Sequence, residues 1–299
     1  MSEMNTIRRT ESSVQVITMC SLPHEVVWRL TSALLPRLIR ADDFAVYVPE
    51  NEEAHFAQIT PRPVRVLPKS LLNGSYVNAL HQALVECGNS ARFGWYLQQF
   101  HKIEAILQSP AELVAIWDAD CVPLRPIDLF DEIGRPIYME ATEYNEEYFR
   151  AIDRLVGIRK SHGPSFVIPG FPTKKVWVQE LVDAIEKRHK GKTWQEAIIC
   201  STDLHHASGF SETETIGTWI AANYPNSWST QVLSWERHGQ SRFGYASEFN
   251  EDQLVSLGHT RDIAIISFEN WDQKGTKGFA RRLKRALNQV YRQLRGVKH

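Results

Sequence analysis

Two aspartates separated by one residue, Asp118 and Asp120, directly follow an apolar run at residues 113–117. Such a run predicts a buried strand, and ligands of open α/β sheets bind beyond the carboxyl ends of strands. Alternate side chains of an extended chain point to the same side, so both carboxylates can face one cation. Mg²⁺ and Mn²⁺ prefer oxygen ligands and accept phosphate oxygens as well. The spacing therefore predicts a metal-bound, phosphate-bearing substrate, with a simple turn or helix cap as the alternative.

The elements expected to position these carboxylates follow a β-α-β-β-α-β order over the first half of the chain. Strands are expected at residues 14–19, 44–48, 64–67 and 113–117, with helices at residues 26–34 and 95–108. This succession favours a doubly wound, mainly parallel sheet with flanking helices. In the second half, a strand is expected at residues 165–168 and helices at residues 176–187, 194–200 and 212–222.

Composition narrows the class of protein. The chain has 299 residues, is 43% apolar and carries a net charge of −1, which argues against general nucleic-acid binding. Four cysteines without C-x-x-C spacing indicate reduced thiols in a cytosolic protein rather than a disulfide framework or a zinc site. The N-terminus is polar, and no apolar run is long enough to span a membrane. We therefore expect a cytoplasmic protein.

Three segments carry a resemblance to a known family. Residues 94–102 (GWYLQQFHK), 117–120 (WDAD) and 210–217 (FSETETIG) resemble GT-A-fold glycosyltransferases, and most closely a poorly characterised bacterial group of nucleotide-sugar-transferase-like proteins. The resemblance implies a GT-A-like domain of Rossmann type over residues 1–272. It also implies transfer of a sugar from a nucleotide-sugar donor to an acceptor hydroxyl. Asp118 and Asp120 would then hold Mn²⁺ or Mg²⁺ against the donor diphosphate, with Asp120 the more direct ligand.

The same resemblance suggests roles for three further residues. Lys102 and Arg92 would approach the phosphates or the sugar of the donor, with a solvated surface lysine as the alternative for Lys102. His238 would complete the metal shell, with His259 as the second candidate, although a single histidine is more often a surface or core residue. His205 and His206 lie in a polar loop where they could contact the acceptor, but their spacing does not require a metal.

Two glutamates follow Ser211 in the third segment. The spacing Ser211-x-x-Glu214 predicts a capping box, in which Glu214 reaches back to the amide of Ser211. The resemblance suggests instead that a carboxylate at this helix start faces the acceptor and removes the proton from its hydroxyl. If Glu214 caps the helix, Glu212 is the catalytic base; both assignments stay open.

The C-terminal segment, residues 273–299, is the last distinct part of the chain. It contains nine Lys and Arg residues and no acidic residue, with apolar residues at helical spacing. A basic amphipathic helix of this kind can lie on an anionic membrane surface. Packing on the protein surface and binding to nucleic acid are the alternatives. Membrane contact at the cytoplasmic face would suit a glycan or lipid-linked acceptor, as in cell-surface polysaccharide assembly.

Two other functions fit parts of the sequence. The strand followed by Asp118-x-Asp120 also resembles haloacid-dehalogenase-like phosphohydrolases, in which Asp118 would be the nucleophile and Asp120 the acid/base. That motif normally opens the first strand of its domain, whereas here about a hundred residues precede it. A non-enzymatic scaffold at a membrane would rest on the basic C-terminal segment alone.

Overall fold

The computed structural model describes residues 13–160 and 163–272, and these form two compact units. Of the described residues, unit 1 contains 13–22, 39–118 and 128–232, and unit 2 contains 23–38, 119–127 and 233–272. The basic helix expected at residues 273–299 lies outside the described part of the chain.

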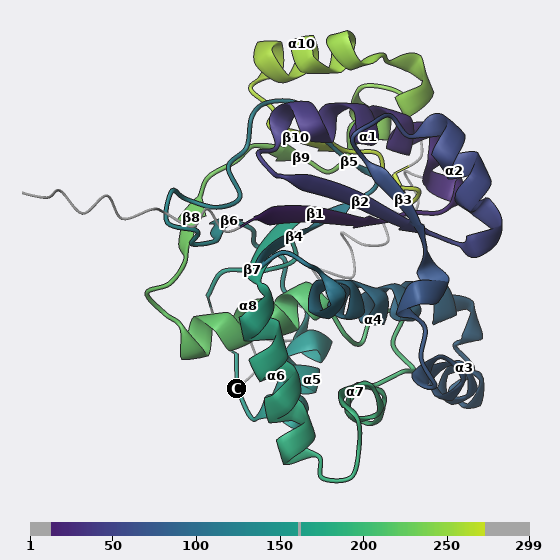
Figure 1. Ribbon diagram of the computed structural model, residues 1–299, viewed down its shortest axis with the longest axis vertical. Helices are drawn as coiled ribbons and strands as arrows, with labels where there is room; N and C mark the ends of the chain where they lie inside the picture. The colour runs from purple at the N-terminus through teal and green to yellow at the C-terminus, as the bar shows by residue number, and fades with distance from the viewer. Residues whose placement is uncertain (1–12, 161–162, 273–299) are drawn as a thin grey trace, which may run out of the picture. The chain divides into compact units, whose positions relative to one another are not determined.

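Unit 1 is built on a five-stranded sheet in the order β3-β2-β1-β4-β7 (Figure 1). Its strands are β1 (Val14–Met19), β2 (Asp43–Val48), β3 (Arg65–Pro68), β4 (Leu113–Asp118) and β7 (Gly170–Lys174). The first four are parallel and β7 pairs antiparallel with β4, so the predicted α/β class with a mainly parallel sheet is confirmed. A short parallel pair, β6 (Ile137–Met139) and β8 (Ser229–Gln231), completes the strands described in this unit.

The helices of unit 1 are α2 (Glu53–Ile59), α3 (Tyr76–Glu86), α4 (Phe93–Gln108), α5 (Glu146–Val156), α6 (Lys175–Arg188), α7 (Trp194–Ser201) and α8 (Glu212–Asn223). Figure 1 shows α3 to α8 on one side of the sheet, where α4 contacts β1 and α6 contacts β7. The expected apolar face of α4 is confirmed by Phe100 and Ile103, which are both buried. These contacts fix α4 and α8 beneath the strands whose ends carry the polar residues.

One predicted strand is wrong, and three helices of unit 1 were not expected. Residues 165–168 form no strand, because the amide of Phe166 donates to a side chain, Glu214 Oε2, at 2.9 Å instead of to a neighbouring strand. The strand lies a few residues later, at β7. Helices α2, α3 and α5 occupy segments for which no helix was predicted.

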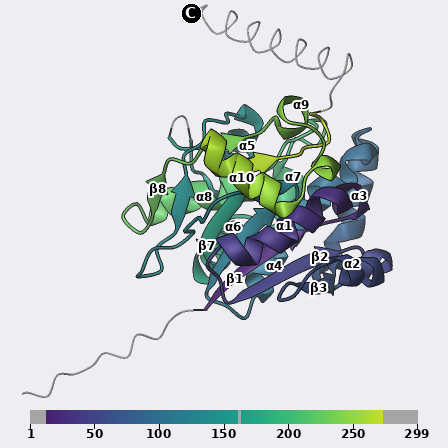
Figure 2. The same ribbon diagram turned by 90° about the horizontal axis from the view of Figure 1, so that it is seen from above.

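Unit 2 contains a three-stranded sheet in the order β5-β10-β9, formed by β5 (Cys121–Pro123), β10 (Ile265–Ser267) and β9 (Trp235–Glu236). Its helices are α1 (Glu25–Leu38), α9 (Gly239–Arg242) and α10 (Glu251–Arg261). Helices α1 and α10 lie side by side in Figure 2, and Arg37 of α1 pairs with Glu251 of α10 at 3.0 Å. Their apolar faces and strands β5 and β10 share one core. Within the described residues, no helix combines the length and apolar character needed to cross a membrane.

Candidate functional site

Asp118 ends β4 at the point where the strand order of unit 1 reverses. Strands β2 and β3 lie on one side of β1 in the sheet, and β4 lies on its other side. Met19 of β1 is paired with Asp118 of β4. In open α/β sheets, ligands bind in the crevice beyond the carboxyl ends of the strands at such a reversal. The carboxylate of Asp118 is 37% exposed, so it can meet a ligand there.

Lys102 connects Asp118 to Glu212. Its ammonium nitrogen lies 3.0 Å from Asp118 Oδ1 and 2.9 Å from Glu212 Oε1. Lys102 comes from α4, and Glu212 is the first residue of α8. The side chains of Lys102 and Glu212 are only 8% and 2% exposed. The structure thus brings together three of the residues predicted from the sequence, from three different elements.

One lysine between two carboxylates leaves a net negative charge, and the pKa values reflect this. Burial alone would lower the pKa of Lys102, but Asp118 and Glu212 outweigh it and hold that pKa above its ordinary value. Burial raises the pKa of Glu212, and the nearby charge of Asp118 adds to this, while Lys102 opposes it. Lys102 therefore stays charged and pairs with both carboxylates, so it is not an exposed cation available to a ligand.

Glu214, two residues further on, faces a different partner. Its side chain forms an ion pair with the buried Lys160 and accepts the amide hydrogen of Phe166 at 2.9 Å. Ser211 Oγ accepts the Glu214 amide hydrogen at 3.2 Å, which is one half of the predicted capping box. The Glu214 carboxylate is directed to Lys160 and Phe166 rather than back to Ser211. Glu214 therefore fixes the segment before β7 to α8, while Glu212 faces Lys102.

Arg92 lies away from this group. It immediately precedes α4, donates to the carbonyl of Ala207 at 2.6 Å and stacks on the ring of Trp95. Ten residues along a helix correspond to about 15 Å, which separates Arg92 from Lys102 along the axis. Burial lowers the pKa of Arg92. In this structure Arg92 fixes a loop, and its predicted contact with a donor stays a prediction.

In unit 2, Asp120 and His238 lie at the same end of the three-stranded sheet. Asp120 comes just before β5 and His238 shortly after β9, and these two strands flank β10. Because β5 is antiparallel and β9 parallel to β10, the start of β5 and the end of β9 both lie beside the end of β10. Two strand spacings place the two backbones about 10 Å apart. Side chains from both positions can therefore reach one ion.

The imidazole of His238 is oriented in a way that suits a metal ligand. Its Nδ1 is buried, has no hydrogen-bond partner within the described chain and lies 3.6 Å from Asp272 Oδ1. The side chain is nevertheless 45% exposed, so Nε2 is the nitrogen that remains for a ligand. Metal-binding histidines commonly direct their other nitrogen toward a carboxylate in this manner. Binding of one divalent cation by Asp120 and His238 stays a prediction.

The sequence missed two groups of polar residues in unit 1. Lys160 could not be paired with Glu214, because nothing in the sequence links positions so far apart. Glu147, Asp203 and His206 also come together, with one possible ligand atom from each within 4.8 Å of the others. The spacing Asp203-x-x-His206 was a signal for this second group, although it is a weak one without the distant Glu147.

Comparisons with known proteins give limited information. No protein family and no curated protein matches the sequence. Among solved structures, mouse xyloside xylosyltransferase 1 in its apo form matches with a TM-score of 0.43 and 11% identity, covering 86% of this chain and 98% of that chain.

Proposed function

We propose that this chain is a glycosyltransferase that moves a sugar from a nucleotide-sugar donor to an acceptor hydroxyl. The observation that carries the proposal is the position of Asp118, an accessible carboxylate at the strand-order reversal of a parallel sheet, held by Lys102. This is the place in such sheets where nucleotides bind. The resemblance of residues 94–102, 117–120 and 210–217 to GT-A-fold enzymes supports the same activity.

Asp120 and His238 are the residues that would hold a divalent cation, Mn²⁺ or Mg²⁺. Asp118 precedes Asp120 by two positions in the chain. A carboxylate with an imidazole suits Mn²⁺ better, because Mg²⁺ prefers oxygen ligands alone. When bound, such an ion stabilises the negative charge of a departing diphosphate.

Lys102 and Glu212 would act on the donor through Asp118. Lys102 is held between two carboxylates, which fixes the Oδ1 atom of Asp118 and orients the exposed part of that carboxylate. Glu212 is 2% exposed, which leaves it almost no surface to meet an acceptor. We therefore propose that Glu212 positions Lys102, in place of the base role suggested by the sequence. A glycan or lipid-linked acceptor stays a prediction. Membrane contact by residues 273–299 also stays a prediction.

Calorimetric titration with nucleotides tests this proposal. UDP, GDP, CMP and dTDP are each titrated with and without Mn²⁺ into the wild type, Asp120→Asn and the control Asp252→Asn. Asp252 is an exposed aspartate in the first turn of α10, in the same unit as Asp120. We expect one nucleotide to bind only with Mn²⁺, about 10- to 100-fold more weakly in Asp120→Asn, and unchanged in Asp252→Asn.

Two results would overturn the proposal. If none of the four nucleotides binds under any condition, the chain has no donor site. If a phosphate monoester such as p-nitrophenyl phosphate is hydrolysed and Asp118→Asn abolishes this, the phosphohydrolase interpretation replaces the transferase.

A further inference from the structure

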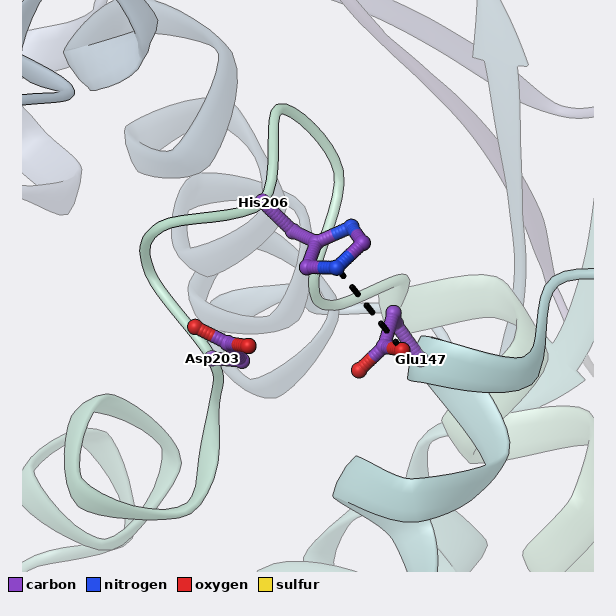
Figure 3. A group of neighbouring side chains, drawn as sticks. All are labelled: Glu147, Asp203 and His206. Atoms are coloured by element: carbon purple, nitrogen blue, oxygen red, sulfur yellow. Dashed lines mark ion pairs between the residues drawn. The ribbon is translucent and has the colours of Figure 1, made fainter.

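We propose that Glu147, Asp203 and His206 form a second cation site, for a first-row divalent ion such as Zn²⁺, which links the start of α5 to the loop leading into α8. Figure 3 shows the three side chains turned toward one another, with Glu147 on the first turn of α5 and the other two on the loop that follows α7. All three belong to unit 1, and none takes part in the group around Lys102.

The donor atoms are spaced for a single ion after a small closure. His206 Nε2 lies 3.8 Å from Glu147 Oε1, and all three candidate ligand atoms lie within 4.8 Å of one another. Nitrogen and oxygen ligands bind Zn²⁺ at about 2.0–2.2 Å, which places ligand atoms around one ion about 3–4 Å apart. Side-chain rotations that move each ligand atom by about 1 Å or less would be sufficient.

The loop that carries Asp203 and His206 is fixed by side chains from other elements. Asn89 donates to the carbonyls of Leu204 and His206 at 2.7 and 2.9 Å. Tyr96 donates to the His206 carbonyl at 2.7 Å and accepts the amide hydrogen of Gly209 at 2.8 Å. The backbone on either side of His206 is therefore held before any ion binds, which lowers the ordering cost of ligation.

Arg150 is the competing cation, and its hold on Glu147 is weak. Its guanidinium lies 2.9 Å from Glu147 and 2.7 Å from Glu146, and its side chain is 54% exposed. The Glu147 side chain is 13% exposed, but the exposed guanidinium is screened by water, so a divalent ion can displace Arg150 from Glu147. Arg150 then keeps Glu146 as its partner, and no charge is left unpaired.

The ligand set selects among cations. Two carboxylates and an imidazole suit Zn²⁺ or Mn²⁺, whereas Ca²⁺ and Mg²⁺ prefer oxygen ligands alone. Three protein ligands with a half-exposed histidine leave at least one position for water. The loop continues into Ser211 and Glu212, so an ion here would anchor the chain segment that places Glu212 beside Lys102.

Zinc titration of the full chain tests the inference, with Asp120→Asn as the background that removes the site proposed above. In this background we compare His206→Gln with His205→Gln, a histidine next to it in the chain that is not among the three donors. Zn²⁺ is followed by competition with a chromophoric chelator, and circular dichroism without metal checks that each variant is folded. We expect His206→Gln to weaken Zn²⁺ binding by about tenfold or more and His205→Gln to change it less than twofold.

The outcomes separate this site from the proposed donor site. Equal Zn²⁺ affinity in folded His206→Gln and His205→Gln would overturn the inference. So would loss of all Zn²⁺ binding in Asp120→Asn alone, which would place the ion at Asp120 and leave the transferase proposal standing. If nucleotide binding fails but His206-dependent Zn²⁺ binding persists, the second site stands and the transferase proposal falls.

Discussion

Replacing Lys102 with methionine is the sharpest test of the buried group in unit 1. Lys102→Met keeps a long apolar stem but removes the cation that lies 3.0 Å from Asp118 and 2.9 Å from Glu212. Glu212 is then a buried carboxylate with no counterion. We expect a large loss of folding stability, because an uncompensated buried charge is far more costly than the original pair was favourable.

The size of the loss follows from the exposure of the two partners. Breaking a buried ion pair by removing one partner typically costs about 3–5 kcal/mol. Asp118 is 37% exposed, so water and salt screen its interaction and its share is small. Glu212 is 2% exposed and carries most of the penalty. Lys102→Met/Glu212→Gln should therefore recover about 2 kcal/mol relative to the sum of the two single changes.

Urea unfolding followed by tryptophan fluorescence at pH 7 measures these free energies. The control is Lys187→Met, an exposed lysine on α6, for which we expect a change of less than about 0.5 kcal/mol. If Lys102→Met costs no more than Lys187→Met, Lys102 does not compensate buried charge. Strict additivity in the double variant would likewise contradict the proposed role of Glu212.

Two further predictions concern other buried positions of unit 1. Burial, with a contribution from Lys69, lowers the pKa of His101 to about 4 from 6.5, so the unfolded chain binds a proton that the folded protein does not. The contribution of neutral His101 to the unfolding free energy is then fully present above pH 6.5 and is lost as the pH falls toward 4. Between pH 7 and 4.5 the wild type should lose about 2.5 kcal/mol more of its unfolding free energy than His101→Gln, and equal losses would contradict the assignment. Gly217→Ala would place a methyl carbon 2.1 Å from the ring of Phe166 and should cost about 1–3 kcal/mol in the same urea assay. Its control Gly94→Ala, which meets nothing within 4 Å, should be neutral or gain about 0.5 kcal/mol, and similar values for both would refute close packing at Gly217.

The strands of the central sheet could be predicted from the sequence, and the elements near β7 could not. Strand β4 is a continuous apolar run up to Asp118, and β1 is apolar apart from Gln15 and Thr18, as expected for strands covered on both faces. The segment at residues 165–168 has the same appearance, but Glu214 binds its backbone from far away in the chain. Strand β7 contains Pro172, which argues against a strand, yet β7 is at the edge of the sheet, where proline is tolerated.

The candidate site was predictable residue by residue but not as an arrangement. Lys102, Asp118 and Glu212 were each identified, whereas the ion pairs that join them depend on how α4 and α8 pack beneath the sheet. The sequence suggested a lysine that reaches a ligand and a glutamate that faces an acceptor. The structure shows instead that Lys102 pairs with both Asp118 and Glu212 and that Glu212 is buried. Exposure is a property of the folded chain, and short motifs carry little information about it.

The loop at residues 203–209 has a path that is encoded outside the loop itself. Asn89, Arg92, Tyr96 and Asn145 hold it through its backbone carbonyl and amide groups, which every amino acid supplies. The exposed side chain at position 205 can therefore be exchanged without changing the course of the chain, whereas the Ser208 hydroxyl also accepts a hydrogen bond from Asn145 at 3.5 Å. This makes the loop a suitable place for sequence drift or for directed evolution. Libraries that randomise the exposed positions of the loop should yield a high proportion of folded variants, provided that they preserve those four residues, the buried Leu204 and Gly209, and the candidate ligands Asp203 and His206.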